Sequence, residues 1–180
     1  MKTFDYQNRS QYEKSQKGRH KLKKDKKKPL SYYQNHLKFF LSYIPNKNDI
    51  KSIICHGVRN DNEIDCFKKI FPGAEVFGTD INYENKNKNI FKYDFSKLSE
   101  EWNRKFNLVY SNAIDHCFDI DETLKEWKRV GTKYMVIVFS GGEPTETDPF
   151  RVEEKDIKEL CEKHNLKILN LCDFVLTAKF

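Results

Sequence analysis

The sequence predicts one α/β domain with a doubly wound, mostly parallel, seven-stranded sheet that ends in an antiparallel hairpin. From residue 51 onward, short apolar runs alternate with segments whose apolar residues recur every three or four positions, as in strands alternating with helices. At the end of the chain, two apolar segments are only two or three residues apart, too few for a parallel crossover. The length of 180 residues suits one domain with a sizeable core and is short for two.

The first 28 residues differ from the rest in charge. They contain 11 of the 33 Lys and Arg residues and three of the 27 Asp and Glu residues, so they carry +8 and the remainder carries −2. The segment shows no hydrophobic periodicity and ends in the basic run from Lys21 to Lys28. Because like charges repel one another, we expect residues 1–28 to form a flexible basic arm and residues 29–180 to form the folded domain.

The first predicted elements are a helix, a strand and a second helix. Residues 31–44 have apolar residues at spacings of three and four, and Pro45 stops this helix. Residues 51–55 form a short apolar run, which predicts a strand. Residues 61–71 place their apolar side chains on one helical face and end at a Pro-Gly pair, which terminates helices.

The alternation continues through the middle of the chain. Short apolar runs predict strands over residues 74–79, 90–93, 106–110 and 134–139. Between the last two, residues 121–130 carry Leu124, Trp127 and Val130 on one side of a predicted helix. The last run is apolar throughout, which is typical of a strand covered on both faces.

The final part begins with a loop rich in Gly, Pro, Thr and acidic residues, residues 141–148. A helix is predicted over residues 152–164. Residues 166–171 and 174–180 are the two apolar segments that predict the closing hairpin.

Composition excludes several classes of protein. The five cysteines are scattered and never spaced as Cys-x-x-Cys, so neither a disulfide framework nor a zinc site is expected, and we predict no metal. The longest apolar run, Met135 to Phe139, is far shorter than the roughly 20 residues of a membrane helix. The first residues lack the apolar core of a secretory signal. We therefore expect a cytoplasmic protein without a membrane partner.

The most informative stretch joins a glycine turn to an acidic strand end. Gly57 follows the strand over residues 51–55, and Asp80 follows the strand over residues 74–79. Neighbouring parallel strands end at the same edge of a sheet, so the turn and the carboxylate are expected to lie close together. A nucleoside cofactor needs such a pair, because its polar tail approaches the backbone and its ribose hydroxyls bind a carboxylate.

Further motifs occur in the same order as in a known family. They are Tyr93-Asp94-Phe95 and the segment from Asn107 to His116. With the glycine turn, the acidic strand end and the terminal hairpin, the chain resembles the class I S-adenosylmethionine-dependent methyltransferases. The resemblance covers residues 50–139 well and residues 140–180 by topology alone, and it does not extend to residues 1–28.

The resemblance implies S-adenosylmethionine as the cofactor. Gly57 would let the backbone turn beneath the methionine part. Arg59 would pair with the cofactor carboxylate, and Asn60 would supply a polar contact. The family usually has an acidic residue and two or three glycines in this turn, whereas Cys55 and His56 precede a single glycine here. A non-catalytic module that keeps the fold is therefore the alternative.

The resemblance also implies roles around the adenosyl group. Asp80 would accept hydrogen bonds from the ribose diol, and Ile81 would cover one face of the adenine. Asp94 would accept from the adenine amino group, and Phe95 would donate its amide or cover the ring. Each aspartate also has a plainer interpretation, as a turn-forming residue after a strand.

Three residues near the end of the strand over residues 106–110 would face the reaction. Ser111 and Asn112 would lie by the reacting sulfonium and the substrate entrance. His116 would deprotonate a hydroxyl, or would orient a loop instead. Methyl transfer needs a base only where the acceptor must lose a proton, so a missing catalytic dyad is compatible with an enzyme.

The acceptor is constrained mainly by missing motifs. Ser111-Asn112-Ala113-Ile114 stands where amino-directed nucleic-acid methyltransferases have Asn-Pro-Pro-aromatic, and no Lys-Asp-Lys-Glu set is evident. A small-molecule or glycan-like acceptor is therefore our first expectation, with nucleic acid as the second class. The alternative module would bind RNA, DNA or a nucleoprotein assembly through the basic arm, where tyrosines accompany the cations.

Overall fold

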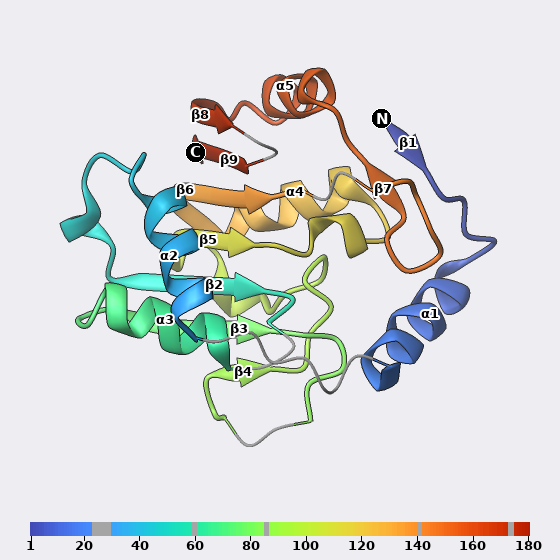
Figure 1. Ribbon diagram of the computed structural model, residues 1–180, viewed down its shortest axis with the longest axis horizontal. Coiled ribbons are helices and arrows are strands. Elements are labelled where there is room, and N and C mark those ends of the chain that lie inside the picture. The colour runs from blue at the N-terminus through green and yellow to red at the C-terminus, as the bar shows by residue number, and fades with distance from the viewer. Residues whose placement is uncertain (23–29, 59–60, 85–86, 140–141, 173–174) are drawn as a thin grey trace.

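A seven-stranded sheet forms the centre of the protein, in the order β4-β3-β2-β5-β6-β9-β8. The computed structural model describes residues 1–22, 30–58, 61–84, 87–139, 142–172 and 175–180. The five strands from β4 to β6 in that order run parallel, and β9 and β8 complete the sheet as an antiparallel pair. The carboxyl ends of the parallel strands therefore share one edge, on the right in Figure 1.

The strands of this sheet are β2 (Ser52–His56), β3 (Glu75–Thr79), β4 (Ile90–Phe91), β5 (Phe106–Ser111), β6 (Gly131–Val138), β8 (Lys167–Cys172) and β9 (Val175–Lys179). Side chains alternate between its two faces, as the pleat requires. On β2, Ile53 and Cys55 enter one hydrophobic cluster while Ile54 enters the other. Both faces are apolar because both are covered by helices.

Two pairs of helices cover the sheet: α2 (Leu30–Leu41) with α3 (Asn62–Ile70), and α4 (Ile120–Val130) with α5 (Glu154–Lys163). The first pair packs on the face of Ile53, and the second on the face of Ile54, where Trp127 of α4 is fully buried. Short 3₁₀ turns occur at Lys47–Asp49, Glu100–Trp102 and Ile114–His116. No helix in the described part of the chain combines the length and apolar character needed to cross a bilayer.

The predicted fold class is confirmed. Every strand and helix expected after residue 30 is present, with ends within three residues of the predicted positions. The largest differences are at the start of β6, which follows α4 directly at Gly131, and at the end of α2, where the last turn before Pro45 is irregular. The terminal hairpin is β8 and β9, as the short connection requires.

The N-terminal segment contacts the domain through residues 1–16, whereas its charge predicted a flexible arm over residues 1–28. Strand β1 (Lys2–Thr3) pairs antiparallel with β7 (Phe150–Arg151), and the terminal ammonium lies 2.5 Å from Asp156 Oδ1. Helix α1 (Arg9–Leu22) then crosses the carboxyl edge of the large sheet (Figure 1). Residues 23–28, which hold most of the basic run, lie outside the described residues. Contacts to distant parts of the domain thus extend from Met1 to Gln16, despite the positive charge of the segment.

A buried histidine lies between the sheet and α4. His56 is 1% exposed, its Nδ1 is 2.8 Å from Thr79 Oγ1, and its ring stacks on Trp127 with centroids 4.9 Å apart. No described residue bonds its Nε2. Burial lowers the pKa of His56 to about 3. An unfolded histidine titrates near 6.5, so on acidification the unfolded chain takes up this proton first, and stability is lost between about pH 6.5 and 3.

Replacing His56 with phenylalanine should therefore flatten the acid limb of the stability curve. Two pH units below 6.5, the wild type should have lost roughly 2–3 kcal/mol that the His56→Phe variant does not lose. Urea unfolding at pH 7 and pH 4.5 measures the difference for both proteins. His36→Gln, at an exposed imidazole on α2, is the control and should keep the wild-type slope. Parallel curves for wild type and His56→Phe would mean that His56 is protonated in the native state.

Candidate functional site

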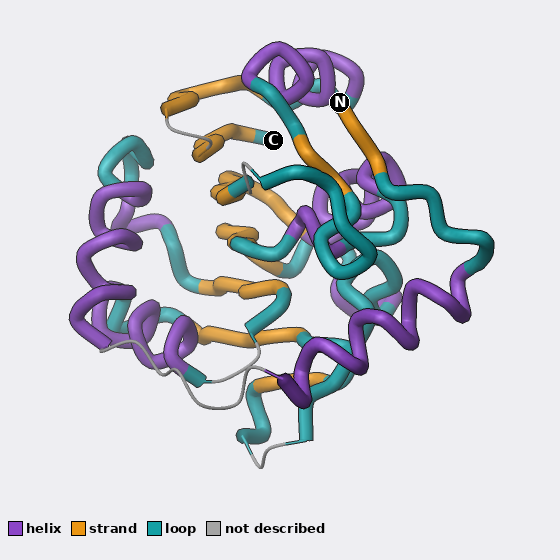
Figure 2. The backbone as a smooth tube through the Cα atoms, turned by 45° about the vertical axis from the view of Figure 1, so that its right-hand side comes forward, coloured by secondary structure: helices purple, strands orange, loops and turns teal. Residues whose placement is uncertain are grey.

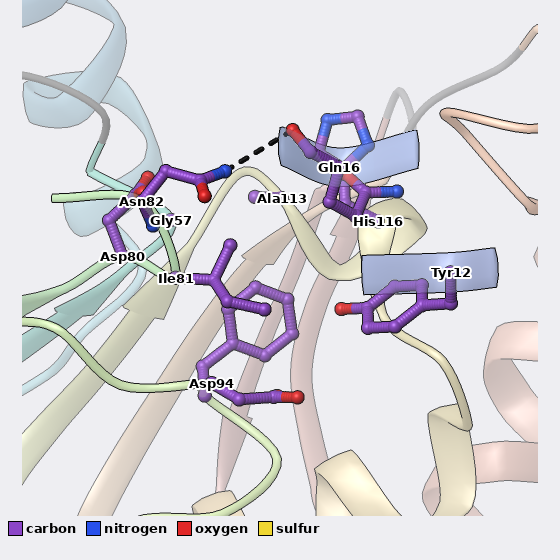
Figure 3. A pocket seen from close by; sticks show the side chains of 10 residues that line it. Tyr12, Gln16, Gly57, Asp80, Ile81, Asn82, Asp94, Ala113 and His116 are labelled. Atoms are coloured by element: carbon purple, nitrogen blue, oxygen red, sulfur yellow. Dashed lines mark hydrogen bonds between the residues drawn. The ribbon is translucent and has the colours of Figure 1, made fainter. Parts of the chain in front are cut away.

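A cavity that opens to solvent lies at the carboxyl edge of the parallel strands. It is lined by Tyr12, Gln16, Gly57, Asp80, Ile81, Asn82, Asp94, Phe95, Ala113 and His116. These residues come from α1 and from the segments that follow β2, β3, β4 and β5. Figure 3 shows the side chains of the β3 segment on one side and those of α1 opposite them.

The turn at Gly57 forms the wall of the cavity beside β2. Its φ is +75°, a conformation that residues with a Cβ rarely adopt, and its N–H donates to Thr79 O at 2.8 Å. A Cβ added there would lie 2.4 Å from Ala113 Cβ. The glycine is therefore required both by its backbone conformation and by the close approach of the segment after β5.

The segment after β3 presents a carboxylate. Asp80 is 5% exposed, and its Oδ1 accepts a hydrogen bond from Asn82 N at 2.8 Å. This local bond fixes the orientation of the carboxylate within the turn. Ile81, between them, lines the same cavity and supplies an apolar surface next to the acid.

The segment after β4 presents a second carboxylate, which is already paired. Asp94 Oδ1 accepts from Ser96 N and Ser96 Oγ, and its Oδ2 forms an ion pair with Arg9 of α1. Both side chains are largely covered, with exposures of 27% for Arg9 and 14% for Asp94. Phe95 is buried beneath them, and its carbonyl accepts from Trp127 Nε1 at 3.0 Å.

Helix α1 forms a roof over the cavity, running across the front of the sheet edge in Figure 2. Tyr12 is 2% exposed, and its burial, followed by the nearby charge of Asp94, raises its pKa above the usual value. Gln16 O accepts from Asn82 Nδ2 at 3.2 Å, and Gln16 Nε2 donates to Thr147 O at 3.1 Å. The roof is thus bonded to both sides of the cavity.

A second set of contacts joins the roof to the loop before β7. Tyr6 Oη and Ser15 Oγ both donate to Glu146 O, at 2.5 and 3.0 Å. The rings of Tyr6 and Tyr12 also contact Phe118, and the Arg9 guanidinium lies 5.5 Å from the centre of that ring. These aromatic contacts give α1 an apolar anchor in addition to its hydrogen bonds.

His116 lies between the cavity and the same loop. Its Nδ1 is 2.7 Å from Thr147 O and 3.3 Å from Asp148 Oδ1. With Asp115, His116 and Asp148 form a group whose possible metal-binding atoms lie within 4.8 Å of one another. The contacts of His116 Nδ1 with Thr147 O and Asp148 Oδ1 account for the approach of His116 and Asp148, and we assign no metal to the group.

The structure brings together six of the residues predicted for the site: Gly57, Asp80, Ile81, Asp94, Phe95 and His116. Ser111 is fully buried beneath the cavity, where its Oγ donates to His56 O and accepts from Ala113 N. Asn112 is exposed and donates to Glu63 Oε1 at 3.3 Å, so neither of these two residues is part of the lining. Arg59 and Asn60 lie outside the described residues.

Sequence reasoning missed the residues of α1. Arg9, Tyr12 and Gln16 are spaced by three and four residues, so they share one helical face. Only one of the three is aromatic, and a search for apolar periodicity therefore does not detect them. The spacing of these three residues by three and four positions does predict a shared helical face. The net positive charge of the segment instead favoured the interpretation as a flexible arm.

The sheet ends in an antiparallel hairpin, and a glycine turn follows β2, the middle one of its five parallel strands. Solved structures of methyltransferases have a similar fold. A methyltransferase from Archaeoglobus fulgidus, described as S-adenosylmethionine-dependent, superposes with a TM-score of 0.59 at 17% identity, covering 77% of this chain and 70% of that one. The plantazolicin methyltransferase BpumL superposes with a TM-score of 0.58 at 13% identity, covering 95% of each chain. This chain has the class I methyltransferase fold.

Other proteins with the class I fold also superpose. Phosphoethanolamine N-methyltransferase 2 from Haemonchus contortus matches with a TM-score of 0.57 at 17% identity, and the match covers 74% of this chain but 36% of that one. This chain therefore spans about a third of the larger enzyme. No protein-family model and no curated protein matches the sequence. The class I fold is thus recognised through structure, at identities where the likeness establishes the fold alone.

Proposed function

We propose that this protein is an S-adenosylmethionine-dependent methyltransferase that acts on a small-molecule or glycan-like acceptor. The main support for the proposal is that Gly57 and Asp80 line the same cavity, just beyond the carboxyl ends of the adjacent parallel strands β2 and β3. In an open α/β sheet, ligands bind outside the carboxyl ends of the strands, where strand order reverses. In this sheet the reversal lies beside β2, which adjoins both β3 and β5.

The residues present fit the adenosyl group. Gly57 lines the cavity with backbone atoms alone, so the cofactor tail could approach the backbone closely there. The Asp80 carboxylate would accept from the ribose diol, and Ile81 and Phe95 would enclose the adenine. Asp94 would accept from the adenine amino group. Arg59, Asn60 and Ser111 remain predicted contacts to the methionine part or the sulfonium.

Bound S-adenosylmethionine would supply an activated methyl group on sulfur. The chain's contribution is to align the acceptor with that group and to exclude water. The roof of Tyr12 and Gln16 would serve the second purpose, because it covers the cavity from the solvent side. His116 would accept the acceptor's proton, and Asn112, at the rim, would contact the acceptor.

Calorimetric titration with S-adenosylmethionine and S-adenosylhomocysteine tests the proposal. Binding with a dissociation constant in the micromolar range is expected, equivalent to roughly −8 kcal/mol at 1 μM. An absence of heat at millimolar ligand would exclude the enzyme. A screen of acceptors with labelled cofactor would then identify the substrate class, including nucleic acid.

The alternative is a module without catalysis, suggested by the single glycine of the turn, that would bind nucleic acid through the basic arm. Residues 1–22 instead pack on the domain and contribute to the lining of the cavity. This arrangement supports a small-ligand site more than an extended electrostatic surface. The salt dependence of RNA or DNA binding, with and without the basic run of residues 21–28, distinguishes the two.

Removing the Arg9 side chain should strengthen cofactor binding. The guanidinium occupies the Asp94 carboxylate that we assign to the adenine amino group, so the two donors compete. We expect Arg9→Gln to lower the dissociation constant for S-adenosylhomocysteine by about three- to tenfold, equivalent to one partly buried charged hydrogen bond. Calorimetry measures it. Lys17→Gln, at an exposed site on the same helix, is the control. Weaker binding by Arg9→Gln would instead make Arg9 part of the binding site.

A further inference from the structure

His116 is held by the loop before β7 in one defined tautomer. Its Nδ1 lies 2.7 Å from the carbonyl oxygen of Thr147. A carbonyl oxygen only accepts hydrogen bonds, so the hydrogen must be on Nδ1. In the neutral imidazole the lone pair is then on Nε2, the nitrogen on the other side of a ring that lines the cavity.

Asp148 stands behind the same nitrogen. Its Oδ1 is 3.3 Å from His116 Nδ1. Its Oδ2 accepts from Thr147 Oγ1 at 3.0 Å, and its backbone N–H donates to Thr145 Oγ1 at 3.1 Å. The turn of residues 145–148 is closed by Thr145 N donating to Asp148 O at 2.9 Å. One compact turn therefore supplies both acceptors that face Nδ1.

The roof helix stabilises this turn from the solvent side. Gln16 Nε2 donates to Thr147 O, the oxygen that also accepts from His116, and a carbonyl with two lone pairs can accept both. Ser15 and Tyr6 donate to the preceding carbonyl, that of Glu146. Closure of α1 over the cavity and orientation of His116 are thus linked through one loop.

We propose that Asp148 is the positioning residue of His116, and that the acceptor's attacking atom carries both a lone pair and a proton, as in a hydroxyl or a neutral amine. This inference rests on the proposed methyltransferase function. As the acceptor atom bonds to the methyl carbon, the sulfur–carbon bond breaks and its electron pair stays on sulfur. The acceptor proton passes to Nε2, and the resulting imidazolium is stabilised by the Asp148 carboxylate beside Nδ1.

The arrangement of charges also restricts the acceptor. His116 lies close to the carboxylates of Asp115 and Asp148. Among the described residues, Arg9 is the one Lys or Arg side chain that forms an ion pair with the cavity lining, and its partner there is Asp94. A negatively charged acceptor would meet like charges at this end of the cavity. The inference therefore favours neutral or cationic acceptors over phosphates and carboxylates.

Nitrogen-15 NMR of histidine-labelled protein tests the inference without an acceptor. At about pH 8.5, where histidine is generally neutral, the Nδ1 signal of His116 should be of the protonated type and Nε2 of the unprotonated type. An unconstrained imidazole prefers the opposite tautomer, so this result would reflect the loop. A wild-type protein with the proton on Nε2 would overturn the proposal.

Two variants separate positioning from a purely structural role of Asp148. Asp148→Asn should lower the ratio of the Nδ1–H tautomer to the Nε2–H tautomer at least about twofold, because the charged acceptor is lost while Thr147 O remains. Thr145→Val removes hydrogen bonds of the turn but keeps the carboxylate, and should retain the wild-type tautomer. Equal shifts in both variants, or none in Asp148→Asn, would assign Asp148 to turn formation alone. Failure of the proposed function would appear separately, as absence of S-adenosylhomocysteine binding by calorimetry.

Discussion

Replacing Asp80 with asparagine is expected to weaken cofactor binding at least about 100-fold, or about 2.7 kcal/mol. In the proposed complex the ribose diol would donate two hydrogen bonds to Asp80, and hydrogen bonds accepted by a charged group contribute about 1.5–3 kcal/mol each. Asparagine would offer one acceptor and place a donor where the second ribose hydroxyl would donate. Calorimetry with S-adenosylhomocysteine gives the two dissociation constants directly.

The substitution should leave the fold intact, so the loss can be assigned to the site. Asp80 accepts from Asn82 N through one oxygen, and an asparagine carbonyl can accept the same bond. Asp49→Asn removes a carboxylate with 54% exposure, outside the lining, and is the matched control. An affinity for Asp80→Asn within about threefold of the wild type would remove Asp80 from the cofactor site.

The central architecture could be predicted because each of its causes is local. Residues 134–138 of β6 are apolar throughout since both faces are covered there, and α4 presents Leu124, Trp127 and Val130 at helical spacing to one cluster. The hairpin of β8 and β9 follows from a connection too short for a crossover. These features need no information about distant residues.

The site could be predicted in part. Gly57 and Asp80 converge because register pairs the ends of β2 and β3, with His56 opposite Thr79. Ser111 ends β5 and Asn112 follows it, but Ser111 is buried and donates to His56 O, whereas Asn112 is exposed and donates to Glu63. The end of a strand determines the position of the Cα atom, whereas the conformation of the following turn determines the direction of the side chain.

The N-terminal segment could not be predicted from its own residues. Its folding depends on acceptors about 130 residues away, the carbonyls of Glu146 and Thr147, and on pairing of β1 with β7. The net charge of the segment suggested that it repels itself. A net charge does not distinguish the faces of a helix, and here one face is buried and carries Tyr12 and Gln16. A charge count describes a segment in isolation and does not reveal a face that is complementary to the rest of the chain.

Substituting Gly57 with alanine should be the most disruptive single change at the site. A residue with a Cβ at φ +75° costs roughly 1–2 kcal/mol, and the contact of 2.4 Å with Ala113 Cβ adds roughly 1–3 kcal/mol of overpacking. The free energy of unfolding should therefore fall by roughly 2–5 kcal/mol, out of the 5–15 kcal/mol typical of a domain. Urea unfolding measures the loss.

Gly73→Ala is the control. No atom lies within 4 Å of a Cβ added at Gly73, and Gly73 does not have the positive φ that Gly57 has. It should change stability by less than about 0.5 kcal/mol. Relief of the contact in Gly57→Ala must move either β2 or the segment after β5, and both border the cavity. Affinity for S-adenosylhomocysteine should therefore fall together with stability. A variant that loses stability but binds normally would separate the turn's role in folding from a role in holding the cofactor.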